Sequence, residues 1–135
     1  MRLSRMTGDI GLEQKAEQLT RVFSNEVAAH PMAYTQLLLA LDFMAGPSKE
    51  IVITGDRGLE AARAMVNAVH RKFLPNKVLL FRPEGPEGER LASLSPFVEP
   101  MAPIDHKTTV YVCERYACKT PITDANQLEA ALECQ

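Results

Sequence analysis

The hydropathy pattern of this chain centres on a short apolar run at residues 51–53, which are Ile, Val and Ile. Three β-branched residues ended by Thr-Gly-Asp predict a buried strand that runs into a tight turn. Over residues 59–73, apolar side chains recur on one stripe, which predicts an amphipathic helix. Residues 77–81 form a second apolar run. Residues 50–81 therefore predict a right-handed βαβ unit with parallel strands, and Asp56 is placed to cap its helix.

The first 47 residues follow a helical pattern. Residues 1–10 resemble the tail of a helix that ends in a turn at Thr7-Gly8-Asp9. From residue 12 to residue 29 the apolar spacing again indicates an amphipathic helix, which Pro31 ends. A second helix is expected from residue 32 to residue 45, where Gly46-Pro47 stops it. Two helices joined by a sharp break form an αα-hairpin.

The composition changes after the βαβ unit. Residues 82–109 are rich in proline and glycine, and we expect a connection packed across the sheet edge, with one or two helical turns at 89–94. Residues 109–113 predict a third strand, and a last helix starts near residues 121–124, with Thr123 or Asp124 as its cap.

The predicted fold class is α/β, with an N-terminal αα-hairpin packed on a small three-stranded, mainly parallel sheet with flanking helices. The expected division is a helical hairpin over 1–47 and an α/β module with a proline-rich connection over 48–135. The second helix is apolar nearly all round, so it needs cover on more than one side. We therefore expect an exposed apolar patch and self-association through residues 12–45.

Composition narrows the classes of function. Hydrophobic residues make up 46% of the chain and charged residues 24%, as in a folded globular domain. The net charge of −2, with no basic block, argues against a nucleic-acid partner. The longest apolar run, at residues 37–41, is far short of the roughly 20 residues of a membrane span. An odd number of cysteines without a paired framework favours the cytoplasm, so we expect a cytoplasmic protein without a membrane partner.

In a parallel sheet, ligands bind beyond the carboxyl ends of the strands. The expected rim site brings together residues that follow the predicted strands, namely Gly55, Asp56, Arg57, Arg82 and Cys113. A helix N-terminus flanked by glycines and an arginine suits a phosphate or a carboxylate. However, the segment matches neither nucleotide-binding glycine motif, and Asp56 would repel an anion. An ordinary strand–turn–helix is therefore the favoured interpretation.

Cys113 and Cys118 form a C-x₄-C pair. A redox pair is more usually C-x-x-C at a helix start, and a zinc site needs about four ligands. Cys134 and His106 are the other available ligands, but they make no second close pair, so no metal or cofactor is expected. Buried reduced thiols are the favoured interpretation, and a Cys113–Cys118 disulfide remains open if the chain turns between them. No catalytic residue is assigned, because no nucleophile elbow or carboxylate pair stands out.

Two segments carry a resemblance to a known family. One runs from Phe23 through residues 31–43 into Asp56, and the other is Tyr111 to Lys119 followed by residues 121–124. Together they resemble the C-terminal end of the spermatogenesis-associated, thioredoxin-like protein family. The Cys-Glu-x-x-x-Cys stretch with its Pro-x-Thr-Asp tail is the most specific part. The resemblance implies an N-terminal thioredoxin-like domain, an (α/α)₆ toroid like those of sugar epimerases and six-hairpin glycosidases, and a final small α/β segment.

The resemblance implies that this chain is a non-catalytic C-terminal segment whose partner is the rest of a larger polypeptide. The family's thioredoxin-like domain, its cysteine motif and most of the toroid are missing here, so any carbohydrate or thiol-redox activity would belong to the full-length protein. The competing hypothesis is a small α/β enzyme subunit with a thiol or phosphosugar site at the rim. A third is a binding module that docks through the proline-rich connection.

Overall fold

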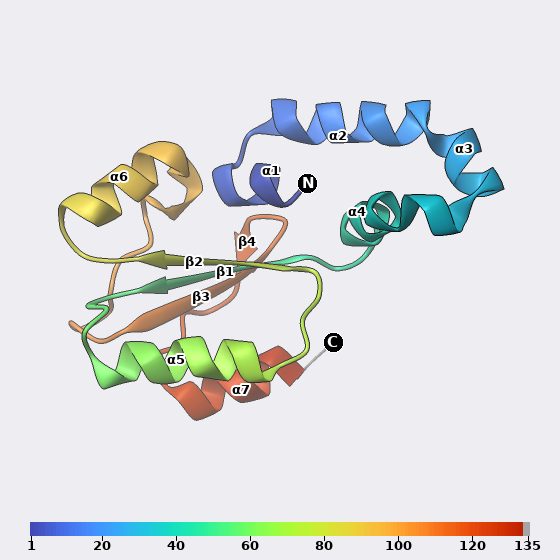
Figure 1. The fold of residues 1–135 in the computed structure, drawn as a ribbon. Helices are drawn as coiled ribbons and strands as arrows, with labels where there is room; N and C mark the ends of the chain where they lie inside the picture. The colour runs from blue at the N-terminus through green and yellow to red at the C-terminus, as the bar shows by residue number, and fades with distance from the viewer. Residues whose placement is uncertain (134–135) are drawn as a thin grey trace.

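The computed structural model describes residues 1–133 and centres on a mixed four-stranded sheet (Figure 1). The strands are β1 (Lys49–Thr54), β2 (Lys77–Arg82), β3 (Thr109–Glu114) and β4 (Ala117–Cys118), in the order β2-β1-β3-β4. The pair β1 and β2 is parallel, whereas β3 runs antiparallel to both β1 and β4. The α/β class is confirmed in this coarser form.

The expected three-stranded, mainly parallel sheet is wrong in two respects. The long connection after β2 brings the chain back beside the end of β1, so that Thr109 pairs with Thr54 and β3 runs in the reverse direction. Apolar residues mark a strand but not its direction. The fourth strand has only two residues, both exposed, so it leaves no hydropathy signal.

Helices cover both faces of the sheet (Figure 1). Helices α5 (Glu60–Arg71) and α7 (Ala125–Glu133) lie on one face, and α1 (Arg2–Thr7) and α6 (Pro86–Leu94) on the other. Side chains along β1 alternate between these two layers. On the α5 and α7 side, Ile51 and Ile53 pack with buried residues of α5, α7 and β3, which include Met65, Val69, Val110, Val112 and Leu128. On the α1 and α6 side, Val52 packs with residues that include Leu80, Val98, Met101 and Cys113.

The turn after β1 depends on Gly55, whose φ of 136° is rarely adopted by residues with a side chain. Asp56 follows, and its carboxylate accepts a hydrogen bond from the Gly58 N–H at 2.8 Å. Helix α5 begins only at Glu60 and has no side-chain cap. The expectation that Asp56 caps this helix is therefore wrong, because its carboxylate closes the preceding turn instead.

At α7 the capping prediction is confirmed. The carboxylate of Asp124 accepts hydrogen bonds from the N–H groups of Asn126 and Gln127, at 2.9 and 3.0 Å. These groups have no partner within the helix, so the cap satisfies them.

The proline-rich connection contains regular structure. Pro86 starts α6, and a 3₁₀ turn follows at Pro96–Val98. Proline lacks an N–H, but an N–H at the first position of a helix has no partner within the helix, so no hydrogen bond is lost. The chain approaches itself closely at Gly88, where an added Cβ would lie 2.0 Å from the Pro83 carbonyl oxygen. The one or two expected turns at 89–94 are thus the second part of a nine-residue helix.

Helices α2 (Ile10–Val22), α3 (Ser24–Ala29) and α4 (Thr35–Ala45), with a 3₁₀ turn at Pro31–Tyr34, project beyond the sheet (Figure 1). We call residues 10–45 the helical arm. The first expected helix is interrupted at Phe23, and the second begins as the 3₁₀ turn.

The expected hairpin packed on the sheet is therefore an arm that lies beside it. Contact with the sheet module is seen at the end of α4, where the Asn76 side-chain amide donates to the Asp42 carboxylate at 2.9 Å. Arg2 also lies over the Phe43 ring, 5.2 Å from its centre. Among residues 1–133, no helix is both long enough and apolar enough to cross a membrane.

Candidate functional site

The structure divides the rim that the sequence predicts. Gly55, Asp56, Arg57 and Arg82 lie together where β1 and β2 end. Cys113 lies at the opposite end of the sheet, because β3 is antiparallel and its register pairs Cys113 with Glu50 at the start of β1. The predicted site is therefore separated into two places.

The four residues that remain together have local structural roles. Arg82 donates a hydrogen bond to the Met101 carbonyl oxygen at 2.6 Å and so fixes the proline-rich connection. The Arg57 guanidinium lies 5.1 Å from the centre of the Phe81 ring. Beside it is an open pocket of about 480 Å³ between α5 and β2, with Arg63 and Asn67 among its lining. The positive charges of Arg57 and Arg63 at this pocket suit an anion.

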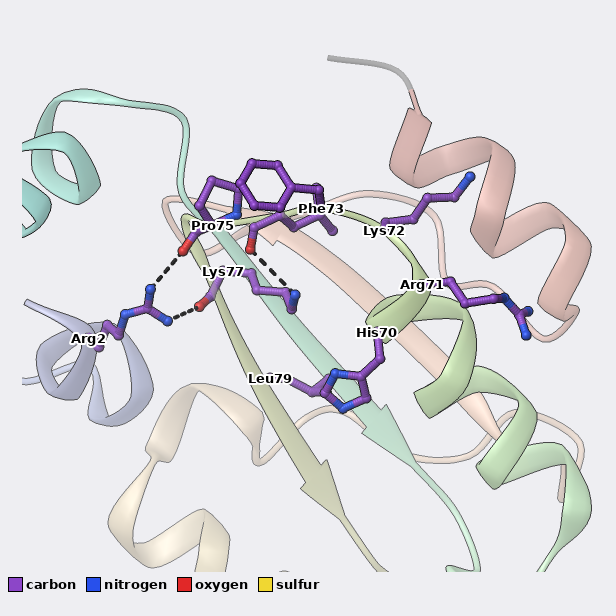
Figure 2. A pocket seen from close by; sticks show the side chains of 9 residues that line it. Arg2, His70, Arg71, Lys72, Phe73, Pro75, Lys77 and Leu79 are labelled. Carbon is purple, nitrogen blue, oxygen red and sulfur yellow. Dashed lines mark hydrogen bonds between the residues drawn. The ribbon is translucent and has the colours of Figure 1, made fainter.

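A larger open pocket of about 660 Å³ lies where α5 ends and β2 begins (Figure 2). Its lining is rich in basic residues and comes from α1, the end of α5, the connection that follows α5, and β2: Arg2, His70, Arg71, Lys72, Phe73, Leu74, Pro75, Lys77 and Leu79. All of these residues except Arg2 lie within residues 70–79, and the fold adds Arg2 from the distant N-terminal helix.

Two basic side chains of this pocket, Arg2 and Arg71, bind other parts of the same chain. Arg2 donates to the carbonyl oxygens of Pro75 and Lys77, at 2.7 and 3.1 Å (Figure 2). Arg71 forms an ion pair with Glu129 and lowers the pKa of that carboxyl. These contacts hold α1 to the edge strand and α5 to α7, so we assign the pocket a structural role.

The hairpin of β3 and β4 carries a disulfide between Cys113 and Cys118, whose Cα atoms are 3.8 Å apart. Cys113 is fully buried and Cys118 is exposed. The expectation of buried reduced thiols is therefore wrong, and the structure shows the disulfide that the spacing left open. The chain turns at Arg115 and Tyr116, with φ of 52° and 64°. Residues with a Cβ occupy this left-handed region at a cost of about 1–2 kcal/mol each, so the turn depends on its surroundings.

Glu50 is a buried charged residue beside this hairpin. It is fully buried and lies directly opposite Cys113 on the face of the sheet that carries Val52. Its Oε2 accepts a hydrogen bond from the Tyr116 N–H at 3.1 Å, and its Oε1 lies 3.8 Å from Arg5 Nη1. Burial raises the pKa of Glu50, although the Tyr116 N–H and Arg5 each act to lower it. Within residues 1–133, Oε1 has no hydrogen-bond donor.

Tyr116 connects this cluster to α1. Its hydroxyl donates to the Ser4 carbonyl oxygen at 3.0 Å, and its ring meets Phe97 edge-on at 5.2 Å. The Arg5 guanidinium lies 5.7 Å from the centre of the Tyr116 ring and also pairs with Glu13 at 3.5 Å. Burial raises the pKa of the Tyr116 hydroxyl. The hairpin turn therefore holds α1 and the segment after α6 against one end of the sheet.

Sequence reasoning missed Glu50, because a charged residue before an apolar run is usually solvated. One signal was available in the sequence. Side chains alternate between the two faces of a strand, so Glu50 lies on the same face of β1 as the buried Val52. In the part of the chain that the structure describes, no group of three or more His, Cys, Asp or Glu side chains is placed to hold a metal ion. Cys134, considered above as a zinc ligand, lies outside the described residues.

Comparisons with known proteins agree with the resemblance. No family model matches the sequence. Human spermatogenesis-associated protein 20 is 34% identical over 132 residues, or 98% of this chain, and the rat protein of the same name is 32% identical over the same length. The chain spans only 17% of the length of these relatives.

One solved structure, spinach chloroplast thioredoxin f in its short form, aligns with 70% of this chain and 81% of its own. It shows 15% identity and a TM-score of 0.46, a value too low to assign a common fold. The relationship rests on the sequence matches. By these matches the chain is related, over nearly its whole length, to one segment of the spermatogenesis-associated protein family, as its residues predict.

Proposed function

We propose that this chain is a non-catalytic structural segment at the C-terminal end of a larger cytoplasmic polypeptide. The observation that carries the proposal is the exposed apolar surface of the helical arm. Its exposed large apolar side chains are Ile10, Leu19, Val22, Phe23, Met32, Leu38 and Leu39. Within residues 10–45 only Val27 and Phe43 are buried.

Such a surface favours association. Contiguous apolar patches beyond a few hundred Å² are rare on monomers and usually mark an interface. At about 25 cal/mol per Å², covering roughly 300 Å² is worth about 7 kcal/mol before the entropy lost on association is subtracted. A covering surface that belongs to the same polypeptide loses less translational and rotational entropy than a separate molecule does. It therefore stabilises the arm most.

The relatives offer such a cover, because most of their length lies outside the matched segment. We propose that the arm is the last hairpin of an α/α toroid, as the resemblance implies, and that any catalytic turnover of a carbohydrate or thiol substrate belongs to the full-length protein. In this proposal residues 1–47 belong to the toroid and residues 48–135 form the α/β module. Helix α1 is the joint between them, since Arg2 and Tyr116 tie it to the sheet.

Sedimentation velocity over a range of concentrations tests this proposal. The chain should self-associate through the arm, and the double variant Val22→Glu/Leu39→Glu should be monomeric. Phe73→Glu is the matched control, because Phe73 is 91% exposed but lies on the sheet module. A parent chain that stays monomeric at high concentration, or association that depends on Phe73 and not on the arm, would contradict the proposal.

A further inference from the structure

We propose that the Cys113–Cys118 disulfide is a thiol–disulfide exchange site, in which an external thiolate attacks Cys118 and Glu50 gives a proton to the departing Cys113 sulfur. This site lies at the end of the sheet opposite the predicted rim. It is distinct from the structural role of the helical arm.

The two cysteines differ in access. Cys118 belongs to the exposed two-residue strand β4, whereas Cys113 is fully buried in β3. An incoming sulfur therefore reaches Cys118 from solvent, and Cys113 is the sulfur that leaves. Arg115 and Lys119 are exposed on either side of Cys118, and their charges favour the approach of a thiolate. Glu114, 3.6 Å from Lys119, offsets part of that charge.

Glu50 is placed to act on the leaving sulfur. Residues directly opposite each other in an antiparallel pair have Cβ atoms about 4.5–5.5 Å apart, and Glu50 and Cys113 are such a pair on one face. The Glu50 Oε1 lies 3.8 Å from Arg5 Nη1 but accepts no hydrogen bond among the described residues, so a proton on this oxygen would displace no donor. Burial favours the protonated carboxyl that this role requires.

Other charged or titratable groups face Glu50 from the elements packed around it. Arg5 of α1 stabilises the carboxylate form, and Glu13 of α2 pairs with Arg5 from the other side. Glu114 of β3 favours the protonated form of Glu50. The Tyr116 hydroxyl, which donates to Ser4, completes this set.

The exchange takes two successive thiolate attacks, the first on Cys118 and the second on the mixed disulfide. A thiolate RS⁻ bonds to Cys118, the Cys113–Cys118 bond breaks, and Cys113 leaves as a thiolate that takes the proton of Glu50. A second thiolate then attacks the R sulfur of the mixed disulfide and releases RSSR. Cys118 takes a proton from water, and Glu50 regains one from solvent. Two electrons thus pass from two thiols to the protein disulfide.

The reductant is defined by class as a thiol, either a small monothiol or a dithiol. A monothiol leaves a mixed disulfide on Cys118 when it is limiting, whereas a dithiol closes its own ring and leaves two protein thiols. Disulfides in cytoplasmic proteins are more often transient than structural. A disulfide that exchanges with thiols therefore fits the cytoplasmic location proposed above.

The first test maps the attacked sulfur. A Cys134→Ser chain is treated with limiting glutathione or with dithiothreitol, quenched with an alkylating agent and analysed by peptide mass spectrometry. We expect the glutathione adduct on Cys118 and the alkyl group on Cys113, and both cysteines alkylated after dithiothreitol. An adduct mainly on Cys113, or two free thiols before any reductant is added, would overturn the proposal.

The second test isolates Glu50. The second-order rate of reduction, expressed per concentration of thiolate, is measured against pH for the same chain and for its Glu50→Gln and Glu114→Gln variants. In the parent this rate should fall as pH rises and Glu50 loses its proton. Glu50→Gln should be slower by at least about tenfold at the acid end and independent of pH. Glu114→Gln, which removes the charge of the neighbouring carboxylate, should keep the fall in rate with pH, displaced to lower pH because Glu114 favours the protonated form of Glu50.

A Glu50→Gln variant with the parent pH profile would overturn the role of Glu50. Circular dichroism and the thermal midpoint of each variant distinguish loss of fold from loss of the proton donor. A correctly folded Glu50→Asp variant should restore part of the pH dependence, which a purely structural role would not do.

Discussion

In β1, Ile51, Val52 and Ile53 are fully buried, whereas in the helical arm Val22 is 74% exposed and Leu39 is 62% exposed. Both regions were expected from the same kind of signal, a run or stripe of apolar residues. The difference lies in what surrounds them. The sheet has helices on both faces, while the arm projects beyond the sheet (Figure 1).

The comparison shows that apolar residues mark surfaces to be covered without saying what covers them. In the sheet module, α5 and α7 on one side and α1 and α6 on the other provide the cover. In the arm, the Thr20 hydroxyl of α2 lies 3.8 Å from the Met44 sulfur of α4, yet most of the apolar side chains of these helices still meet solvent. We interpret the core of the sheet module as covered on both faces, and we propose that the arm is an interface.

The largest expected difference is between truncations in the two regions. Ile53→Ala removes a fully buried side chain from the core, and it should lower the free energy of unfolding by about 2–5 kcal/mol. Leu39→Ala in the arm should change it by less than about 0.5 kcal/mol, because the side chain already meets solvent. Urea unfolding followed by circular dichroism measures both values in dilute protein. Equal losses would mean that the arm is covered after all.

A methyl group at Gly88 tests the packing of the proline-rich connection. Gly88→Ala places a Cβ against the Pro83 carbonyl oxygen, so the backbone must move, and we expect a loss of about 1–3 kcal/mol. Ser93→Ala on the exposed side of the same helix is the control, with a change within about 0.5 kcal/mol. Similar stability for the two variants would show that the backbone around Gly88 moves without loss of stability.

The two helix caps give a smaller and more selective comparison. Asp124 caps α7 of the sheet module, and Asp9 caps α2 of the arm through the N–H groups of Gly11 and Leu12. Asp124→Ala should lower the free energy of global unfolding by about 1 kcal/mol. Asp9→Ala should lower it less, because an uncovered arm frays before the sheet unfolds. An equal effect in denaturant titrations would indicate that the arm and sheet unfold as one unit.

The free energy of unfolding should depend on pH through Glu50. The raised pKa of Glu50 means that its contribution to stability is complete below the ordinary glutamate pKa and is lost as pH rises through the folded-state pKa. Glu50→Gln should remove this decline, whereas Glu114→Gln should not. Free energies of unfolding at several pH values measure the slopes. A parallel decline in the parent and in Glu50→Gln would assign the pH dependence to another group.

Much of the fold was predictable where local residues determine it. The β-branched run at residues 51–53, the stripe on α5 and the Asp124 cap all act within one element, and the structure contains each of them. Helix α6 was only partly predicted, because prolines and glycines usually break helices, yet Pro86 occupies its first turn.

The candidate site could not be predicted from local pattern. The direction of β3 depends on how a long connection crosses the sheet, and that direction decides whether Cys113 joins Arg57 at the rim or Glu50 at the other end. The left-handed turn at Arg115 and Tyr116 is equally hidden, since neither residue is one that such turns favour. Tertiary contacts hold this turn, and sequence patterns do not report tertiary contacts.

Hydrogen–deuterium exchange of the dilute, monomeric chain tests the central claim most directly, because it compares the two regions in one experiment. Amides of β1, which is paired on both sides, should exchange only by global unfolding, while amides of α2 and α4 should exchange much faster through local opening. At concentrations where the chain self-associates, protection should increase in the arm and stay unchanged in the sheet. Equal protection of arm and sheet in the monomer would contradict the account, since it would show that the arm needs no further cover.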